Sequence, residues 1–361
     1  MILARGLFLA ASLIFAVQSE AYEQLGRSII QLPRMTAMGG AGIGLADDEY
    51  TLFYNPAGLA GSNMRRLQLM GLGVEGSWDI ATTVQDSLSA FKTFNQNSMN
   101  LLMGKDIYVR GGITPMVLLP HFAIAYVNDF QGAISEYNTA NPTFHFGDQI
   151  TRGIQAGMGW SFSHGRHPKD EYRFGLSGKY LWRRGGYYDV STSGFLAATT
   201  DPKGFINNIV GDYGTGMGID TGFQYVNHMD KKSDISFGIS GTDITYTHFS
   251  SQQAAVIPAS WGFGFGYKTH IPFFKLAAAA DLRDFNRDTS FSNKVHFGGE
   301  LGIPLMDFYL GWSQLSMTYG FAFDLWVMRI DVMSYEQQLG NYYNQQASRR
   351  YMLHINLNLP I

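Results

Sequence analysis

Residues 37–60 read AMGGAGIGLADDEYTLFYNPAGLA, and their first ten positions are dominated by glycine and alanine. Seven of those ten are small: Ala37, Gly39, Gly40, Ala41, Gly42, Gly44 and Ala46. A backbone that carries almost no side chains can pass very close to other backbone. The stretch is therefore expected to lie in a tight enclosure.

A sharp turn is expected at the end of the same stretch, in Asn55-Pro56-Ala57-Gly58. A residue before proline is disfavoured in the helical region, and Pro56 fixes its own φ. Gly58 permits a positive φ. The motif predicts that the chain reverses direction directly after the short aromatic run 52–54.

The order of small residues, an acidic pair, an aromatic pair and NPAGLA resembles the N-terminal segment of the FadL-type outer-membrane transport proteins (OMPP1/FadL/TodX). It is equally similar to that segment in their PorV-like and TraF-like relatives. The resemblance implies a plug, or hatch, inside a fourteen-stranded barrel, with Asn55, Pro56, Ala57 and Gly58 as its turn. The alternative is a plain turn that leads into a first strand. The runs FGISGTDI and IPASWGFGFGYK look more like the PorV/TraF branch, which includes partners in protein secretion.

The first 21 residues have the pattern of a secretory signal: Arg5, an apolar core at 7–17 and a small-x-small cleavage site at Ser19-Glu20-Ala21. The core is shorter than the roughly 20 residues of a spanning helix. The chain has no cysteine, which excludes disulfides, thiolate metal sites and a lipid-modified cysteine. We expect export to the outer membrane of a Gram-negative-type cell.

Composition is typical of a transmembrane barrel. The chain has 42 Gly, 20 Tyr and 26 Phe but only 15% charged residues, where a soluble domain usually has about 25%. A barrel in a bilayer has an apolar outer face with aromatic girdles and a polar lumen. The net charge of −3, with no basic cluster, excludes a nucleic-acid partner.

The alternation of apolar and polar residues along the chain also supports a transmembrane barrel. Odd positions from 351 to 359 are Tyr, Leu, Ile, Leu and Leu, whereas even positions are Met, His, Asn and Asn. Such a period of two predicts strands with one face toward lipid and one toward water. Fourteen runs of this kind are expected as strands: 65–76, 119–128, 133–140, 151–163, 171–184, 213–228, 233–243, 257–269, 273–285, 293–304, 306–315, 317–326, 327–336 and 350–359.

Connections sort by length. Short periplasmic turns are expected around Asp129, 164–170, 229–232, 270–272, Pro304 and Trp326. Longer outer loops are expected at 77–118, 141–150, 185–212, 244–256, 286–292 and 337–349. This predicts an all-β transmembrane antiparallel barrel at 64–361, with a hatch at 22–63 in its lumen and both termini in the periplasm. Residues 79–95 have a helical apolar face and predict a short amphipathic helix. Residues 109–119, interrupted by Pro115, are either another strand or a segment folded into the mouth.

Several charged residues are expected to face the lumen: Lys179, Arg183, Asp281, Arg283, Glu300, Asp324, Arg329 and Asp331. One interpretation is a network of ion pairs that keeps the interior polar and holds the hatch. In the other, Arg283, Arg329 or Lys179 binds an anionic head group through a charge-assisted hydrogen bond. His121, His296 and His354 are expected to face inward as solvated side chains.

Phe53 and Tyr54 are candidates for a small apolar ligand pocket, from which a molecule would leave sideways through a strand kink. They could equally be the packing of the plug against the wall. No nucleophile elbow, HExxH motif or phosphate loop is present, so neither an enzyme nor a cofactor or metal is expected.

Two functions remain. The first is passive uptake of small hydrophobic or amphipathic molecules, with membrane lipid and an apolar ligand as partners. The second is a plugged barrel that helps other proteins to be secreted or attached to the surface.

Overall fold

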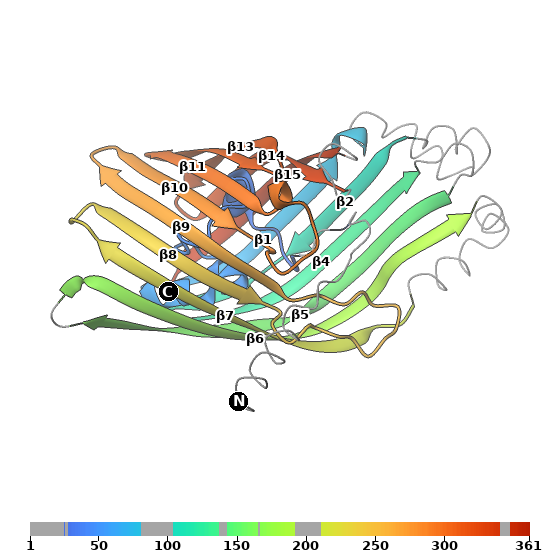
Figure 1. Cartoon of the computed structure of the whole chain (residues 1–361), viewed down its shortest axis with the longest axis horizontal. Coiled ribbons are helices and arrows are strands. Elements are labelled where there is room, and N and C mark those ends of the chain that lie inside the picture. The colour runs from blue at the N-terminus through green and yellow to red at the C-terminus, as the bar shows by residue number, and fades with distance from the viewer. Residues whose placement is uncertain are drawn as a thin grey trace, which may run out of the picture.

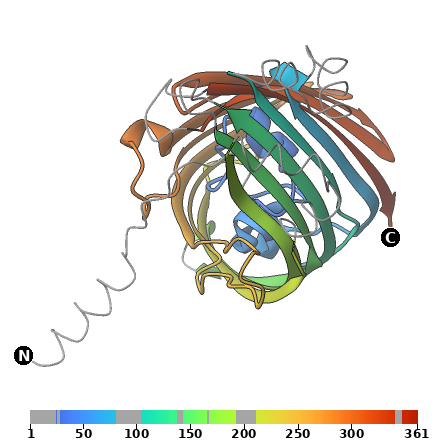
Figure 2. The ribbon, with the colours of Figure 1, turned by 90° about the vertical axis from the view of Figure 1, so that its right-hand side faces the viewer.

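The computed structural model describes residues 25, 28–80, 104–136, 143–164, 167–191, 211–339 and 347–361. Its strands form one antiparallel sheet that closes on itself, because the last strand pairs with the first (Figures 1 and 2). In chain order they are β1 (Arg66–Ser77), β2 (Asp106–Ile113), β3 (Met116–Leu119), β4 (Phe122–Glu136), β5 (Thr143–His164), β6 (His167–Ser191), β7 (Gly214–His228), β8 (Ser233–Thr242), β9 (Ser260–Ile271), β10 (Phe274–Leu282), β11 (Val295–Ile303), β12 (Met306–Ser313), β13 (Ser316–Leu325), β14 (Met328–Gln338) and β15 (Ala347–Pro360).

β2 and β3 are two halves of one barrel strand. Both pair with β1 on one side and with β4 on the other. Thr114 and Pro115 separate them, and Pro115 has no N–H to donate to a ladder. The fifteen labelled strands therefore make a barrel of fourteen, and the expected fold class is confirmed. The open question about 109–119 is also answered, because this run completes the second strand.

The two rims of the barrel differ. One rim carries two- to four-residue turns, such as Pro272-Phe273 between β9 and β10. The other rim carries long connections such as 243–259 and 283–294. The second of these contains a short 3₁₀ helix, η2 (Phe291–Asn293). By the usual arrangement of such barrels the short-turn rim faces the periplasm. One tight turn also lies at the outer rim: Gln314 and Leu315, both with positive φ, connect β12 to β13 close to the predicted position.

The predicted periplasmic turn around Asp129 is wrong. β4 continues through it from Phe122 to Glu136, so the strands expected at 119–128 and 133–140 are one strand, and 137–140 lie outside the described residues. Asn128-Asp129 has the composition of a turn, but Asp129 faces the lumen and binds Arg110 at 2.7 Å. The real turn is Pro120-His121, which leaves His121 exposed at the rim rather than inside.

Two predicted outer loops are shorter than expected. β5 begins at Thr143 and β6 continues to Ser191, and the two pair with each other over this extension, with Phe144 opposite Val190. Residues 143–150 and 185–191 therefore belong to strands. Residues 185–191 project past the start of β7 at the outer rim, whereas β4 pairs with β5 up to Glu136 opposite Phe144 (Figure 1).

The predicted signal segment, 1–21, lies outside the described residues, as does most of the predicted helix at 79–95; only 78–80 are described, and they are helical. No helix in the described ranges is both long and apolar enough to cross a membrane.

The N-terminal segment fills the lumen (Figure 2). We call residues 28–64 the hatch. It contains α2 (Pro33–Ala37), α3 (Thr51–Tyr54) and the 3₁₀ helix η1 (Pro56–Gly61). Two apolar clusters fix the hatch against the wall. One joins Leu52, Phe53 and Leu59 to β3 and β4, and the other joins Ala37 and Met38 to β10 and β12–β15.

Candidate transport site: the hatch and its cavities

Close backbone contact with the wall explains two glycines of the hatch, Gly39 and Gly44. Gly39 has φ +68°, and a Cβ there would lie 2.6 Å from the Trp312 backbone N. At Gly44 a Cβ would lie 2.6 Å from the Phe265 carbonyl carbon and 2.7 Å from the Gly266 N. The tight enclosure predicted from the small residues is thus the inner surface of the barrel.

Asn55 connects two parts of the hatch. Its side chain is fully buried, its Nδ2 donates to the Ile43 carbonyl at 2.9 Å, and its Oδ1 accepts from the Ala57 N–H at 3.2 Å. Pro56 then occupies the first turn of η1, where a missing N–H costs nothing. Where a turn with a positive φ at Gly58 was expected, the chain forms the 3₁₀ helix η1, and Gly58 does not have a positive φ. Gly58 is needed because a Cβ would collide with the Ala46 carbonyl.

Inward-facing polar side chains of the wall bind the hatch backbone. The Asp281 carboxylate accepts from the Gly42 and Ile43 N–H groups at 2.7 and 2.8 Å. Gln224 Nε2 donates to the carbonyls of residues 44 and 45, both at 2.7 Å. Further wall donors from Gln155, Ser240, Arg283 and Thr318 reach the carbonyls of residues 52, 54, 40 and 37.

A cluster of charges holds the periplasmic side of the hatch. Arg34 lies between Asp47, at 2.6 Å, and Glu300 of β11, also at 2.6 Å. Burial alone would raise the pKa of Asp47, but Arg34 and Lys268 hold it well below its usual range. Burial raises the pKa of Asp48 to about 6, although Arg34 opposes the rise.

The other predicted lumen charges are mostly paired. Lys179 lies between Asp220 and Asp243, at 2.8 Å from each. Arg183 donates to Thr151 at 2.9 Å and to the Ala255 carbonyl at 3.0 Å. Both cations thereby fasten the outer connection 243–259 to the lumen.

Arg329 binds Asp307 at 2.8 Å and Asp331 at 3.1 Å. Asp324 lies 3.5 Å from Arg329, but its side chain is 56% exposed, so it belongs to the periplasmic rim rather than to the lumen as predicted. A residue near the end of a strand can satisfy the alternation and still lie beyond the enclosed lumen.

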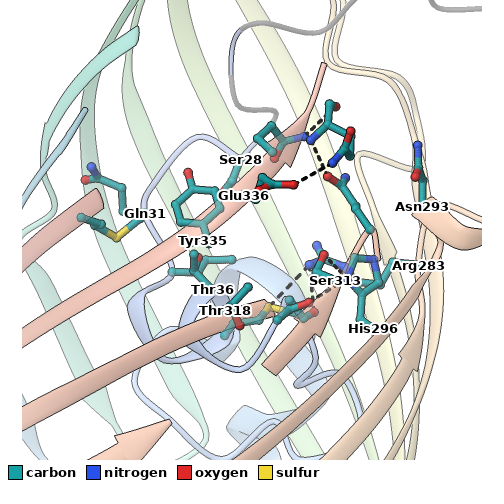
Figure 3. Close-up of a pocket in the computed structure, with 18 of the residues that line it drawn as sticks. Ser28, Gln31, Thr36, Arg283, Asn293, His296, Ser313, Thr318, Tyr335 and Glu336 are labelled. Atoms are coloured by element: carbon teal, nitrogen blue, oxygen red, sulfur yellow. Dashed lines mark hydrogen bonds between the residues drawn. The ribbon is translucent and has the colours of Figure 1, made fainter. Parts of the chain in front are cut away.

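Arg283 differs from the other predicted cations. It donates to the Gly40 carbonyl at 3.0 Å, and within the described ranges no carboxylate lies within ion-pair distance of it. Figure 3 shows Arg283 beside His296 and Ser313, across a cavity from Gln31 and Tyr335. Of the three cations considered for an anionic head group, Arg283 is thus the one whose charge is least compensated.

Three cavities surround the hatch. The outer cavity, about 240 Å³, is the one in Figure 3. The inner cavity, about 130 Å³, has an apolar part lined by Phe53, Tyr54 and Ile257 and a charged part lined by Lys179, Asp243 and Arg287. It shares Met35 and Arg283 with the outer cavity. The periplasmic cavity, about 210 Å³, is lined mainly by charged side chains around Arg34 and Arg329. Phe53 and Tyr54 therefore line a cavity and also pack in the apolar cluster with Leu52 and Leu59.

Sequence reasoning missed the neutral side chains that hold the hatch, above all Gln155, Gln224 and Thr318. The alternation of polar and apolar residues could have identified them, because each occupies a lumen-facing position of its strand. Arg34 was also missed, since nothing in its neighbourhood shows that Glu300 will lie opposite it. No cluster of His, Asp or Glu suited to a metal ion occurs in the described part of the chain.

A closed fourteen-strand antiparallel barrel with its N-terminal segment folded into the lumen is the architecture of plugged outer-membrane barrels. Two solved structures share this fold: the Ralstonia pickettii toluene transporter TbuX (TM-score 0.50, 11% identity, 91% of this chain and 98% of that one) and a deltaS2S3 mutant of the TodX monoaromatic hydrocarbon channel (TM-score 0.50, 10% identity, 95% and 100%). The chain therefore has the FadL/TodX outer-membrane transporter fold that the hatch motif implied. No family model matches the sequence, and no curated protein matches it.

Proposed function

We propose that this barrel takes up small hydrophobic or amphipathic molecules passively across the outer membrane. One observation carries the proposal: the inner wall is apolar where β3 and β4 meet the hatch. Met116 and Leu118 of β3 and Ala123, Ala125 and Val127 of β4 are buried in one cluster with Phe53 and Tyr54. Inward positions of β5 and β7 on the same side of the hatch are more polar, as at Gln155 and Gln224. An apolar molecule would find its most favourable surface along β3 and β4.

An exit beside this surface is supported by the interruption between β2 and β3. The neighbouring strand β1 has a bulge between Gln68 and Met70 in its ladder with β15. The ladders on the two sides of β1 are therefore both irregular at the same height. The Gln68 side chain donates to the Thr114 carbonyl at 2.7 Å and thereby satisfies a group that the interrupted ladder releases. Two backbone bonds also cross the interruption, from the Thr114 N–H to the Gly71 carbonyl and from the Tyr126 N–H to the Pro115 carbonyl, both at 3.0 Å. Because Pro115 has no N–H, the ladder here has one donor fewer than a continuous one and should be easier to part.

The periplasmic cavity makes a sideways exit into lipid more favourable than a straight path. It contains Arg34, Asp47, Glu300 and Arg329, all bound to one another or to neighbouring charges. An apolar molecule that displaced water and counter-charges there would leave polar groups unpaired. Outer-membrane lipid is thus the proposed acceptor of the transported molecule.

The inner cavity favours a ring-sized ligand. Its volume of about 130 Å³ is close to the roughly 150 Å³ of a cavity that binds benzene, although only the part beside Phe53, Tyr54 and Ile257 is apolar. Arg283 lies where the inner and outer cavities meet, so an amphipathic acid could place its carboxylate there and its apolar body beside Phe53. The interpretation of Arg283 as a head-group partner and of Phe53 and Tyr54 as ligand contacts belongs to this proposal.

The test is mass analysis of small molecules extracted from the purified, detergent-solubilised barrel. An apolar compound is expected with the wild type and should be lost when Phe53→Ala and Tyr54→Ala are combined. Phe291→Ala is the control, because Phe291 is 71% exposed outside the lumen. Equal extracts from all three proteins, or none from any, would argue against the pocket.

The alternative, a barrel that serves secretion or surface attachment of other proteins, is favoured by no contact in the described residues. It would gain support if the extracts were empty and one protein copurified in fixed ratio with the barrel.

A further inference from the structure

Hydrogen bonds from the barrel wall to the hatch backbone are concentrated on one side of the barrel. Side chains of β5, β7, β8, β10, β11 and β13 bind its backbone at residues between 37 and 54. Among the described residues, β14, β15 and β1 make no hydrogen bond to the hatch backbone. On this side the hatch meets the wall through apolar packing near Met333 and Met352 and through the Tyr50 hydroxyl. This hydroxyl donates to Asn356 Oδ1 at 2.7 Å and accepts from Gln68 Nε2 of β1 at 3.3 Å.

This weakly held contact also collects unsatisfied polar atoms. We call it the seam. Each of its seven side chains is at least nine-tenths buried and has one nitrogen or oxygen without a hydrogen-bond partner: Gln31 Nε2, Gln68 Oε1, Glu75 Oε2, Asp331 Oδ2, His354 Nδ1, Asn356 Nδ2 and Asn358 Oδ1. Buried polar atoms are nearly always satisfied, so seven along one contact require an explanation.

The seam connects two cavities. Gln31 and Glu75 line the outer cavity, whereas Asp331 and Asn358 line the periplasmic one. His354 and Asn356 lie between them on β15. From residue 352 to residue 358 a strand advances about 20 Å, at about 3.3 Å per residue. The seam is therefore a line of polar groups that passes the hatch from one side to the other.

Two glycines of β1 keep the wall thin along this line. A Cβ at Gly73 would collide with the Gln31 side-chain oxygen and would lie 2.9 Å from His354 Cδ2. At Gly71 a Cβ would lie 3.2 Å from the Asn356 Oδ1. Hatch and wall are thus in direct contact here, and a small outward movement of either would admit water to the unpaired atoms.

We propose that the seam opens to water and gives small hydrated cations a path past the hatch, separate from the apolar route. Movement of the hatch away from the wall at the seam is favoured because water then supplies the hydrogen bonds that the closed contact lacks. Glu75 and Asp331 lie on the path, but each has a cationic neighbour, Arg350 at 4.0 Å and Arg329 at 3.1 Å. The preference for cations over anions therefore rests on the periplasmic end of the path. The periplasmic cavity has more acidic than basic side chains: Asp47, Asp48, Glu49, Glu300, Asp307, Asp324 and Asp331 against Arg34, Arg66, Lys275 and Arg329.

Conductance of the purified barrel in a planar lipid bilayer tests this. The wild type should conduct above the protein-free membrane, and its reversal potential in a potassium chloride gradient should indicate cation preference. The chain has no cysteine, so Gln31→Cys with Gly73→Cys adds one disulfide across the seam. Oxidation of this pair should lower the conductance at least several-fold, and reductant should restore it.

The matched control is a disulfide on the well-bonded side of the hatch, Leu45→Cys with Gly266→Cys, where a Cβ at Gly266 would lie 3.0 Å from the Leu45 N. Oxidation of this pair should leave the conductance unchanged. The proposal fails if the oxidised seam pair, verified by mass, conducts as the reduced form does, or if the wild type does not conduct.

A second variant avoids dependence on disulfide formation. His354→Leu replaces an unsatisfied polar side chain with an apolar one of comparable size, so it should seal the seam. The expected result is lower conductance together with a higher Tm. A variant with unchanged conductance would contradict the proposal.

Discussion

At the scale of single residues, Asn55 connects the two halves of the hatch. Asn55→Ala leaves the buried Ile43 carbonyl and the Ala57 N–H without partners, which costs about 1–3 kcal/mol for each group that water cannot reach. We expect a lower free energy of unfolding in urea titrations of the barrel in lipid. Asn293→Ala is the control, because the Asn293 side chain makes no hydrogen bond in the described part of the chain. Equal losses would show that Asn55 has no special role.

Gly39 allows the hatch to lie against the wall. Gly39→Ala combines a positive φ, which costs about 1–2 kcal/mol for other residues, with a Cβ 2.6 Å from the Trp312 N. The hatch must then shift, so we expect a lower Tm. Gly178→Ala in β6 should be nearly neutral, because no atom lies within 4 Å of the added methyl group. A neutral Gly39→Ala would mean that the hatch is not seated as described.

Asp48 gives the hatch a pH dependence. Its pKa is raised to about 6 in the folded protein, so the protonated form is favoured there. Its contribution to stability is complete below the unfolded pKa of about 3.9 and is lost as the pH rises through 6. Asp48→Asn should therefore remove a decrease in Tm between pH 4 and 7.

Asp47 is the opposite case and serves as the comparison. Its pKa is held below the usual range, so its stabilisation is present at neutral pH and is lost only as the pH falls below about 4. Asp47→Asn should lower Tm by a similar amount at pH 6 and pH 8. Identical pH profiles for the two variants would contradict the charge arrangement around Arg34.

At this scale the sequence predicted which residues face inward better than it predicted what they touch. Alternation placed Asp281 and Glu300 in the lumen. It contained no information that Asp281 binds the N–H groups of Gly42 and Ile43, or that Glu300 binds Arg34, because these contacts join segments more than 230 residues apart.

At the scale of elements, the interruption between β2 and β3 should control sideways exit. Pro115→Val restores an N–H donor, so the second strand can pair continuously with its neighbours. We expect slower uptake of an aromatic hydrocarbon into proteoliposomes, with unchanged or higher Tm. Pro272→Ala, in the turn between β9 and β10, should change neither quantity. If uptake by the Pro115→Val variant were undiminished, the exit would not lie between β2 and β3.

The same elements show where prediction from sequence stops. The long, clean alternation of β15 was found nearly to its ends. β4 was divided because Asn128-Asp129 has turn composition, whereas a buried ion pair between Asp129 and Arg110 keeps the strand extended. β2 and β3 were left undecided because Pro115 interrupts the pattern, and only pairing with β1 and β4 makes them one strand.

At the scale of the whole molecule, the class of barrel followed from period-two alternation, whereas the total of fourteen strands was reached through two errors that cancel: β4 is divided in two, and the strand made of β2 and β3 is not counted. The internal hatch followed from the resemblance of its motif to a known family, since the run of small residues alone predicts only a tight enclosure. The cavities were not predictable in this way. Their positions depend on how the hatch is oriented in the lumen, which is set by contacts from seven or more strands at once.

The central claim, uptake of small hydrophobic molecules, is tested most directly by the rate at which a labelled monoaromatic compound accumulates in cells that produce the barrel. We predict faster accumulation than in cells without it, a return toward the background rate with Phe53→Ala plus Tyr54→Ala, and no change with Phe291→Ala. All three proteins must first be shown to be equally abundant in the outer membrane. An accumulation rate that does not depend on the barrel would contradict the account.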